Sequence, residues 1–100
     1  MSPKTWFLYI IECMDGSLYT GIAVDVEARY AAHCKGAGAR YTRSHTPLRL
    51  LGWEPYPDRS AASRAEYRVK QLSPADKHRY AEAMQANFGK LPGSGPDNST

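Results

Sequence analysis

The sequence has few cysteines and no long apolar segment, and both features exclude classes of protein. Its two cysteines, Cys13 and Cys34, form no CxxC pair, and a disulfide framework or a structural zinc site needs more than that. We therefore predict two buried thiols in a reducing compartment. The longest apolar run, residues 6–11, is far shorter than the ~20 residues of a membrane span. No secretory signal opens the chain, so we expect a cytoplasmic protein without membrane association.

Acidic residues are missing from one stretch that is rich in cations. The net charge is only +3 and the pI is about 9.0. No Asp or Glu lies between Glu27 and Glu54, whereas this interval contains the cations Arg29, Lys35, Arg40, Arg43 and Arg49. Such a cluster is typical of a surface that binds a polyanion. The alternative is a solvated face whose countercharges come from elsewhere in the fold, and composition alone does not decide between them.

The N-terminal third of the chain predicts a β-hairpin. Residues 6–13 and 18–23 are rich in aromatic and β-branched side chains, as strands are. A three-residue loop over residues 14–16, with Gly16 in the left-handed conformation, is a common connection. It pairs Ile11 with Tyr19 and Tyr9 with Gly21, which places both tyrosines on one face as diagonal neighbours about 7–8 Å apart. A two-residue turn would place them on opposite faces.

The remaining elements complete a small α+β domain. We predict a helix from the N-cap Asp25 to about Lys35, a loop over residues 36–47 and a strand over residues 48–53. A helix opened by Ser60 and a last helix from Pro74 to about residue 87 follow. The order β-β-α-β-α-α predicts a three-stranded antiparallel sheet flanked by helices. Residues 1–88 form one domain in this interpretation, and residues 89–100 form a disordered tail.

The first predicted helix carries two basic side chains beside its apolar stripe. Val26, Tyr30 and Cys34 recur at four-residue spacing and form the stripe. Arg29 and His33 are also spaced by four residues, so they lie next to each other on the helix surface. On a helical wheel this pair lies beside the stripe and not opposite it. We therefore expect Arg29 and His33 to border the core at a cleft.

In chain order, these residues resemble the GIY-YIG nuclease domain. The resemblance rests on Leu8-Tyr9-Ile10, Tyr19-Thr20-Gly21, Arg29 and His33 on one helix, and Glu66 on a second. It covers about residues 5–80, and the stretch from residue 13 to 43 is especially similar to small stand-alone bacterial members. Leu8 and Thr20 depart from the glycine and isoleucine of the family motifs. Ile22 stands where some members have a lysine.

The resemblance implies a role for each matching position. These are Tyr9 and Tyr19 as the motif tyrosines, Gly21 as the glycine closing the second motif, Arg29 as the catalytic arginine, His33 near the scissile phosphate and Glu66 as the single acidic metal ligand. Mg²⁺ or Mn²⁺ would be the cofactor, since a hard cation keeps several waters and can be held by one carboxylate. Arg29 offers a planar fork for phosphate oxygens. The pKa of ~10 makes an ordinary tyrosine a poor base, so Tyr9 needs a neighbouring cation, metal or hydroxyl, and Tyr19 or His33 could relay the proton.

Each of these residues also has a purely structural interpretation. A strand tyrosine is more often part of the core than a catalyst, and Arg29 could simply pair with Glu27 or Glu66. Glu66 and Lys70 form an ordinary helix pair, worth about 0.2–0.5 kcal/mol. The ordered set favours a nuclease over these alternatives. His45 and His78 match no motif and receive no role.

The sequence as a whole predicts a metal-dependent endonuclease that cleaves DNA phosphodiester bonds. Lys35, Arg40, Tyr41 and Arg43 would contact the nucleic acid, because cations alternating with an aromatic suit phosphate binding and base stacking. Without a separate specificity domain, branched, flapped, nicked or single-stranded DNA is the expected substrate, in repair or recombination. The alternatives are a nucleic-acid-binding module with weak catalysis and an interaction domain of a repair complex. No protein partner is specified.

Overall fold

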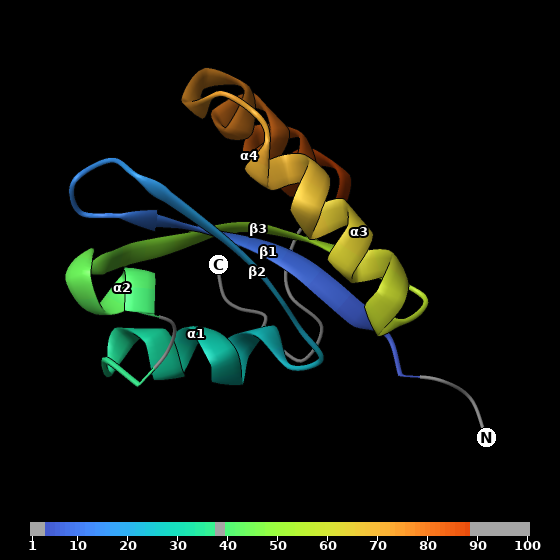
Figure 1. The fold of residues 1–100 in the computed structure, drawn as a ribbon, viewed down its shortest axis with the longest axis horizontal. Coiled ribbons are helices and arrows are strands. Elements are labelled where there is room, and N and C mark those ends of the chain that lie inside the picture. Colours follow the sequence, from blue (N-terminus) through green and yellow to red (C-terminus); the bar gives the residue numbers. More distant parts are fainter. Residues whose placement is uncertain (1–3, 38–39, 89–100) are drawn as a thin grey trace.

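A three-stranded antiparallel sheet lies between two layers of helices (Figure 1). The computed structural model describes residues 4–37 and 40–88. In chain order the elements are β1 (Trp6–Cys13), β2 (Leu18–Ala23), α1 (Val26–Cys34), α2 (Arg40–Ser44), β3 (Pro47–Tyr56), α3 (Arg59–Lys70) and α4 (Pro74–Phe88). The sheet order is β2-β1-β3. The α+β class and the order of the main elements are confirmed.

The β1–β2 hairpin has the register that its turn chemistry predicts. Tyr9 pairs with Gly21 and Ile11 with Tyr19, and the turn closes with a 2.9 Å hydrogen bond from the Cys13 N–H to the Ser17 carbonyl. Gly16 has φ 87°, a left-handed conformation that costs glycine little because it has no Cβ. The three-residue loop is therefore confirmed, and both tyrosines lie on one face.

Alternation along β1 divides the core into two parts. Leu8 and Ile10 are fully buried against α3 and α4, where Val69 and Met84 complete an apolar cluster. Tyr9 and the residues two and four positions on point to the other face, which α1 and α2 cover (Figure 1). Because successive strand residues point to opposite faces, this one strand contributes to both halves of the core.

Three elements of the structure differ from the sequence prediction. The loop over residues 36–47 contains the short helix α2, and β3 extends beyond the predicted strand at both ends. Helix α3 begins one residue earlier than predicted, and its N-cap is Asp58 rather than Ser60. The Asp58 carboxylate accepts a 2.8 Å hydrogen bond from the Ala61 N–H, as an N-cap side chain does. The predicted tail, residues 89–100, lies outside the described residues.

The prediction that both cysteines are buried is wrong for Cys34. Cys13 is buried, but Cys34 is exposed at the end of α1, and His33 takes the inward position. The reason is helical geometry, because seven residues make almost two full turns while an eighth rotates by a further ~100°. His33 therefore lies on the same side of α1 as Val26, whereas Cys34 points in a different direction. Among the described helices, none is both long and apolar enough to cross a membrane.

Candidate active site

The site forms where the Tyr9 side chain crosses the edge strand β2. The Tyr9 ring is almost completely buried, at 1% exposure, and its hydroxyl lies over Gly21. A Cβ at Gly21 would lie 2.6 Å from the Tyr9 hydroxyl and 3.0 Å from a ring carbon of Tyr19. Positive φ angles are found at Gly16 and Gly36 and not at Gly21. Gly21 is therefore required for space, because any side chain would displace the tyrosine.

Three rings meet above this glycine. The ring centroids of Tyr9 and Tyr19 are 6.2 Å apart, and His33 lies 5.9 Å from the first and 5.1 Å from the second. The Tyr9 hydroxyl oxygen lies 2.9 Å from His33 Nε2, and His33 Nδ1 lies 2.6 Å from the Thr42 hydroxyl oxygen. A chain of hydrogen-bonding groups thus runs from Tyr9 through the imidazole to α2. Buried polar groups need such partners.

The electrostatic surroundings keep both Tyr9 and His33 neutral at neutral pH. Burial raises the pKa of the Tyr9 hydroxyl above its ordinary value, and the neighbouring Tyr19 adds to this. The Arg29 guanidinium acts in the opposite direction, and the Glu66 carboxylate raises the pKa again. Burial lowers the pKa of His33, and the charge of Arg29 lowers it further. Arg29 and Glu66 are thus both close enough to act on the Tyr9 hydroxyl.

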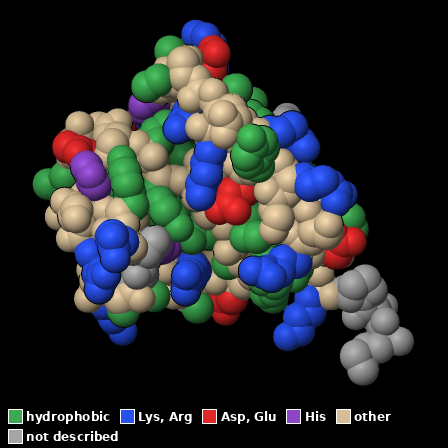
Figure 2. Space-filling view, viewed as in Figure 1, with side chains coloured by type: hydrophobic (Ala, Val, Ile, Leu, Met, Phe, Trp, Pro, Cys, Tyr) green, Lys and Arg blue, Asp and Glu red, His purple; other side chains and the backbone are tan. Residues whose placement is uncertain are grey.

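Arg29 and Glu66 reach Tyr9 from opposite layers of the molecule. Arg29 projects from α1, and Glu66 projects from α3, which packs along β2. The two layers can converge because β2 is an edge strand of the sheet, and Figure 1 shows α1 and α3 on opposite sides of it. In Figure 2, acidic side chains at the centre of this face are bordered by Lys and Arg side chains. The Coulombic effect of Glu66 on the pKa of Tyr9 shows that the two side chains are within electrostatic reach of each other.

The donor set suits a hard cation and not a soft one. Glu66 is 23% exposed, and the Lys70 ammonium lies 3.2 Å from one of its carboxylate oxygens. Within residues 4–37 and 40–88, no three His, Cys, Asp or Glu side chains form a group that could hold a metal ion. A zinc site would need about four protein ligands. Mg²⁺ is commonly held by one or two carboxylates, with waters and phosphate oxygens in its other positions, and Glu66 fits that pattern.

The predicted nucleic-acid contacts fall into two groups. Lys35 and Arg43 line a recess of about 400 Å³ that His33 and Thr42 also border, and Arg40 is exposed at the start of α2. Tyr41 is half-buried, and its ring stacks with Tyr19 at 5.8 Å and with His45 at 4.2 Å. The cations are open to a phosphate backbone. Because the Tyr41 ring is half-buried and stacks with two other rings, it offers less surface to a nucleobase than the sequence analysis predicts.

The sequence interpretation missed the residues that hold the aromatic rings in place. His45 Nδ1 lies 2.7 Å from a carboxylate oxygen of Asp15, and hydrogen bonds from Ser17 and His45 lower the pKa of Asp15. This contact joins the hairpin turn to the residue that follows α2, whose ring stacks on Tyr41. Thr42 was predicted as a substrate contact and not as the partner of His33, to which its hydroxyl oxygen lies 2.6 Å away. No periodicity reveals either partner, because the segment between α1 and β3 was expected to be irregular.

Comparison with known proteins agrees with this geometry. Residues 5–80 match the GIY-YIG catalytic domain. The chain is 48% identical to a UPF0213 protein of Xanthomonas campestris pv. campestris, over 98% of this chain and 93% of the relative. It is 51% identical to the UPF0213 protein YhbQ of Escherichia coli O157:H7, over 91% and 88%. The solution NMR structure of EF2693 from E. faecalis is similar with a TM-score of 0.57 and 29% identity, over 92% of this chain and 99% of that one.

Proposed function

Because the chain belongs to the GIY-YIG family of nucleases, we propose that it is a metal-dependent endonuclease that hydrolyses DNA phosphodiester bonds. The observation that carries this proposal is the buried contact of 2.9 Å between the Tyr9 hydroxyl and His33 Nε2, placed beside Arg29 and Glu66. A tyrosine that served only as core would also need a hydrogen-bond partner for its hydroxyl, but it would not need two opposite charges within reach of that hydroxyl. The grouping supports proton transfer next to a bound anion.

In this proposal the Tyr9 hydroxyl relays a proton without first losing its own. The raised pKa of Tyr9 argues against a free phenolate. With hydrogen on Nδ1 donated to Thr42, His33 Nε2 can accept the Tyr9 proton as the Tyr9 oxygen takes one from the attacking water. The water oxygen then forms the new bond to phosphorus as the bond from phosphorus to the leaving alkoxide breaks, and the alkoxide oxygen takes up a proton from solvent. Since burial and Arg29 lower the pKa of His33, the imidazolium gives the proton up again readily.

Arg29 and Glu66 complete the site on the two sides of this relay. The Arg29 guanidinium presents a planar fork to the phosphoryl oxygens, whose negative charge grows in the transition state. Glu66 would hold Mg²⁺ or Mn²⁺, which supplies charge stabilisation at the reacting phosphate. The Lys70 ammonium, 3.2 Å from a carboxylate oxygen of Glu66, orients this carboxylate. Tyr19 borders both Tyr9 and His33 and keeps the relay dry.

The same surface supports selection of the substrate by shape. Lys35, Arg40 and Arg43 are cations around the site that can contact the backbone of a strand, and backbone contacts carry no sequence information. We therefore propose branched, flapped, nicked or single-stranded DNA as the substrate and repair or recombination as the process. A DNA substrate of this kind would place the protein in the cytoplasm.

Nicking of a supercoiled plasmid tests the proposal. The protein should convert it to the open circle in the presence of Mg²⁺ or Mn²⁺ and stop when EDTA is added. Glu66→Gln should slow the reaction by about 100-fold or more, as expected for loss of the metal ligand. Glu82→Gln removes an equal charge from the exposed face of α4 and should have no effect.

Two outcomes would contradict this function. If DNA is bound but no plasmid, flapped, branched or single-stranded form is cut with either metal, the protein is a binding module. If DNA is neither bound nor cut, an interaction domain is the better description. Cutting that Glu66→Gln leaves unchanged would remove Glu66 from the site.

A further inference from the structure

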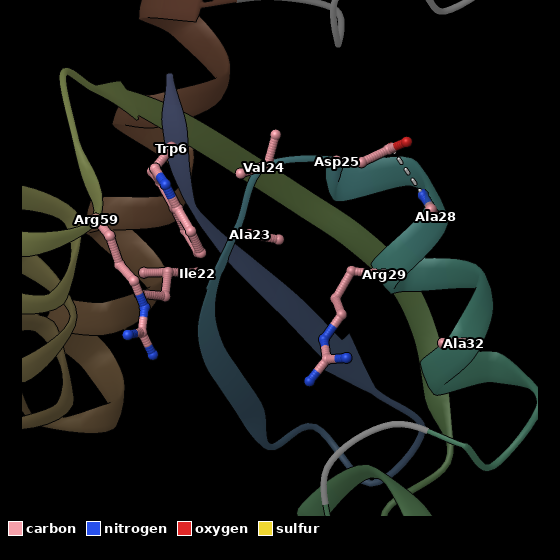
Figure 3. Close-up of a pocket in the computed structure, with 9 residues that line it drawn as sticks. All are labelled: Trp6, Ile22, Ala23, Val24, Asp25, Ala28, Arg29, Ala32 and Arg59. Atoms are coloured by element: carbon pink, nitrogen blue, oxygen red, sulfur yellow. Dashed lines mark hydrogen bonds between the residues drawn. The ribbon is translucent and has the colours of Figure 1, made fainter. Parts of the chain in front are cut away.

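A groove adjoins the candidate active site and is not used by the reaction described above. It has a volume of about 540 Å³ and runs between α1 and the start of α3, across the C-terminal end of β2 (Figure 3). Arg29 forms one side, so the groove begins where the scissile phosphate is proposed to bind. Small ligands occupy pockets of about 300–1,000 Å³. The groove is therefore large enough for one nucleotide of a DNA strand.

The lining of the groove is apolar between two cations. Ile22 on β2 and the short side chains Ala28 and Ala32 on α1 form its walls. Arg29 and Arg59 extend from its opposite sides toward the same end (Figure 3). This arrangement suits an occupant that is anionic at one end and flat and apolar at the other, as a nucleotide is.

Arg59 is held in position by an aromatic ring. Its guanidinium carbon lies 5.6 Å from the centroid of the Trp6 ring, within the range of a cation–π contact. Trp6 is half-buried and also lines the groove. The acidic residue of the lining, Asp25, accepts a 3.0 Å hydrogen bond from the Ala28 N–H at the start of α1. Its carboxylate is thus engaged in capping, and the two guanidinium groups dominate the charge of the groove.

We propose that this groove binds one unpaired nucleotide next to the scissile phosphate. Arg59 contacts its phosphate, and Trp6 and Ile22 contact its base. In a duplex the faces of the bases are covered by their neighbours, so a base reaches an aromatic or apolar wall only when it is unstacked. The inference rests on the proposed nuclease function and narrows its substrate to DNA with a single-stranded segment at the cleavage site, such as a flap.

Binding measured without metal separates this site from catalysis. In EDTA, the full-length protein should bind a fluorescein-labelled single strand of about 15 nucleotides, the length that one small binding fold covers, more tightly than a blunt duplex of the same sequence. Arg59→Ala should weaken single-strand binding about tenfold and reduce the slope of log affinity against log salt by about 0.7, the value for one phosphate contact. Arg79→Ala is the matched control, because Arg79 pairs with Asp76 on α4, away from the groove, and should change neither quantity.

The fluorescence of Trp6 reports on the base. In a Trp53→Phe protein, Trp6 is the remaining tryptophan, and a stacked base should quench it. We expect quenching by the single strand and none by the duplex. Trp6→Phe keeps an aromatic wall and should retain most of the affinity, whereas Trp6→Leu should weaken single-strand binding more than duplex binding.

These outcomes test the proposed nucleotide site separately from the proposed nuclease activity. Absence of quenching, or equal effects of Arg59→Ala and Arg79→Ala, would overturn the nucleotide site. An Arg59→Ala effect that is equal for both DNA forms would leave a phosphate contact but overturn the requirement for an unpaired base. Metal-dependent nicking by the unaltered protein is assayed in parallel, so the proposed function stands or fails on its own result.

Discussion

The two faces of the sheet are filled by different chemistry, although one strand supplies both. On the face of α3 and α4, Leu8 and Met84 belong to a cluster of apolar side chains. On the face of α1 and α2, Tyr9, His33 and Thr42 are buried just as deeply, and they are joined by hydrogen bonds. Apolar packing is non-directional and tolerates changes of shape that keep the volume. A buried hydrogen-bonded chain does not, because each group left without its partner costs free energy.

This difference predicts that stability and the proposed activity depend on different residues of a single strand. Leu8 and Tyr9 are adjacent in sequence and almost equally inaccessible to solvent, so burial alone does not distinguish them. The apolar face should dominate the free energy of unfolding, and the face with the tyrosines should dominate the reaction. Substitutions at neighbouring positions can test that division directly.

The largest expected effect is on catalysis, from Tyr9→Phe. Loss of the hydroxyl interrupts the path to His33 and should lower the nicking rate by at least about 100-fold, in the range of general acid–base contributions. The free energy of unfolding should fall by only about 1 kcal/mol, the usual net value of one hydrogen bond. Plasmid nicking and urea denaturation measure the two quantities on the same sample.

Leu8→Ala is the paired control for that substitution. Removing buried methyl groups should cost about 2–5 kcal/mol of unfolding free energy while leaving the nicking rate of the folded protein nearly unchanged. A Tyr9→Phe protein that is fully active, or a folded Leu8→Ala protein that is inactive, would break the proposed division between the faces.

Two glycines offer a second pair with intermediate effects. A Cβ at Gly21 would lie 2.6 Å from the Tyr9 hydroxyl, and one at Gly52 would lie 3.0 Å from the Met84 Cβ on the other face. Both Gly→Ala changes should destabilise the fold by about 1–3 kcal/mol, the usual cost of overpacking. Gly21→Ala should also slow nicking about tenfold or more, because it displaces the relay tyrosine. Gly52→Ala should leave the rate of the folded protein intact, and thermal unfolding with nicking below the melting temperature would show whether the two variants differ.

The smallest effect concerns pH. Burial and Arg29 hold the pKa of His33 below its ordinary value in the folded protein. Unfolding restores the ordinary pKa of about 6.5, so the unfolded chain binds the extra proton first as pH falls. The contribution of His33 to stability is therefore complete above about pH 6.5 and is lost as the pH falls toward the lowered folded-state pKa, by at most about 1.4 kcal/mol per pH unit.

Urea denaturation at several pH values measures this loss. His33→Gln cannot take up the proton and should show a shallower decrease of stability between neutral pH and about pH 5. The Asp15 carboxylate, whose pKa is lowered, loses its own contribution only below its ordinary value of about 3.9, outside this window. Identical pH dependence in the two proteins would remove His33 as the buried neutral group of this face.

The hairpin could be predicted from the sequence because its determinants are local. The turn residues and the period-two alternation set the register of Tyr9 against Gly21, and the structure shows that register. The burial of His33 in place of Cys34 follows from the seven-residue spacing that places Val26 and His33 on one side of α1. Each four-residue step rotates by about 40° away from that side, so the four-residue spacing used for the prediction selected the wrong residue at the end of the helix.

The proximity of Glu66 to Tyr9 could not be predicted from the sequence of either segment alone. It requires α3 to pack along β2 and β2 to be the free edge of the sheet. The family resemblance implies one site for both residues, and the packing of α3 along β2 is compatible with that assignment. The short helix α2 could not be predicted because its five residues are too few to show a helical periodicity. The contact between His45 and Asp15 could not be predicted because the two residues are 30 positions apart in the sequence.

The central position of β1 affects how the molecule fluctuates. Tyr9 is paired on one side with Gly21 and on the other with Trp53, so its backbone is held by both neighbouring strands. Segments of this kind open only with the whole domain, whereas helix ends and outer strands fray locally. The tyrosine of the proposed relay is therefore expected in the slowest-opening part of the chain. Arg29 and Glu66 belong to helices that can move relative to it as a strand binds and leaves.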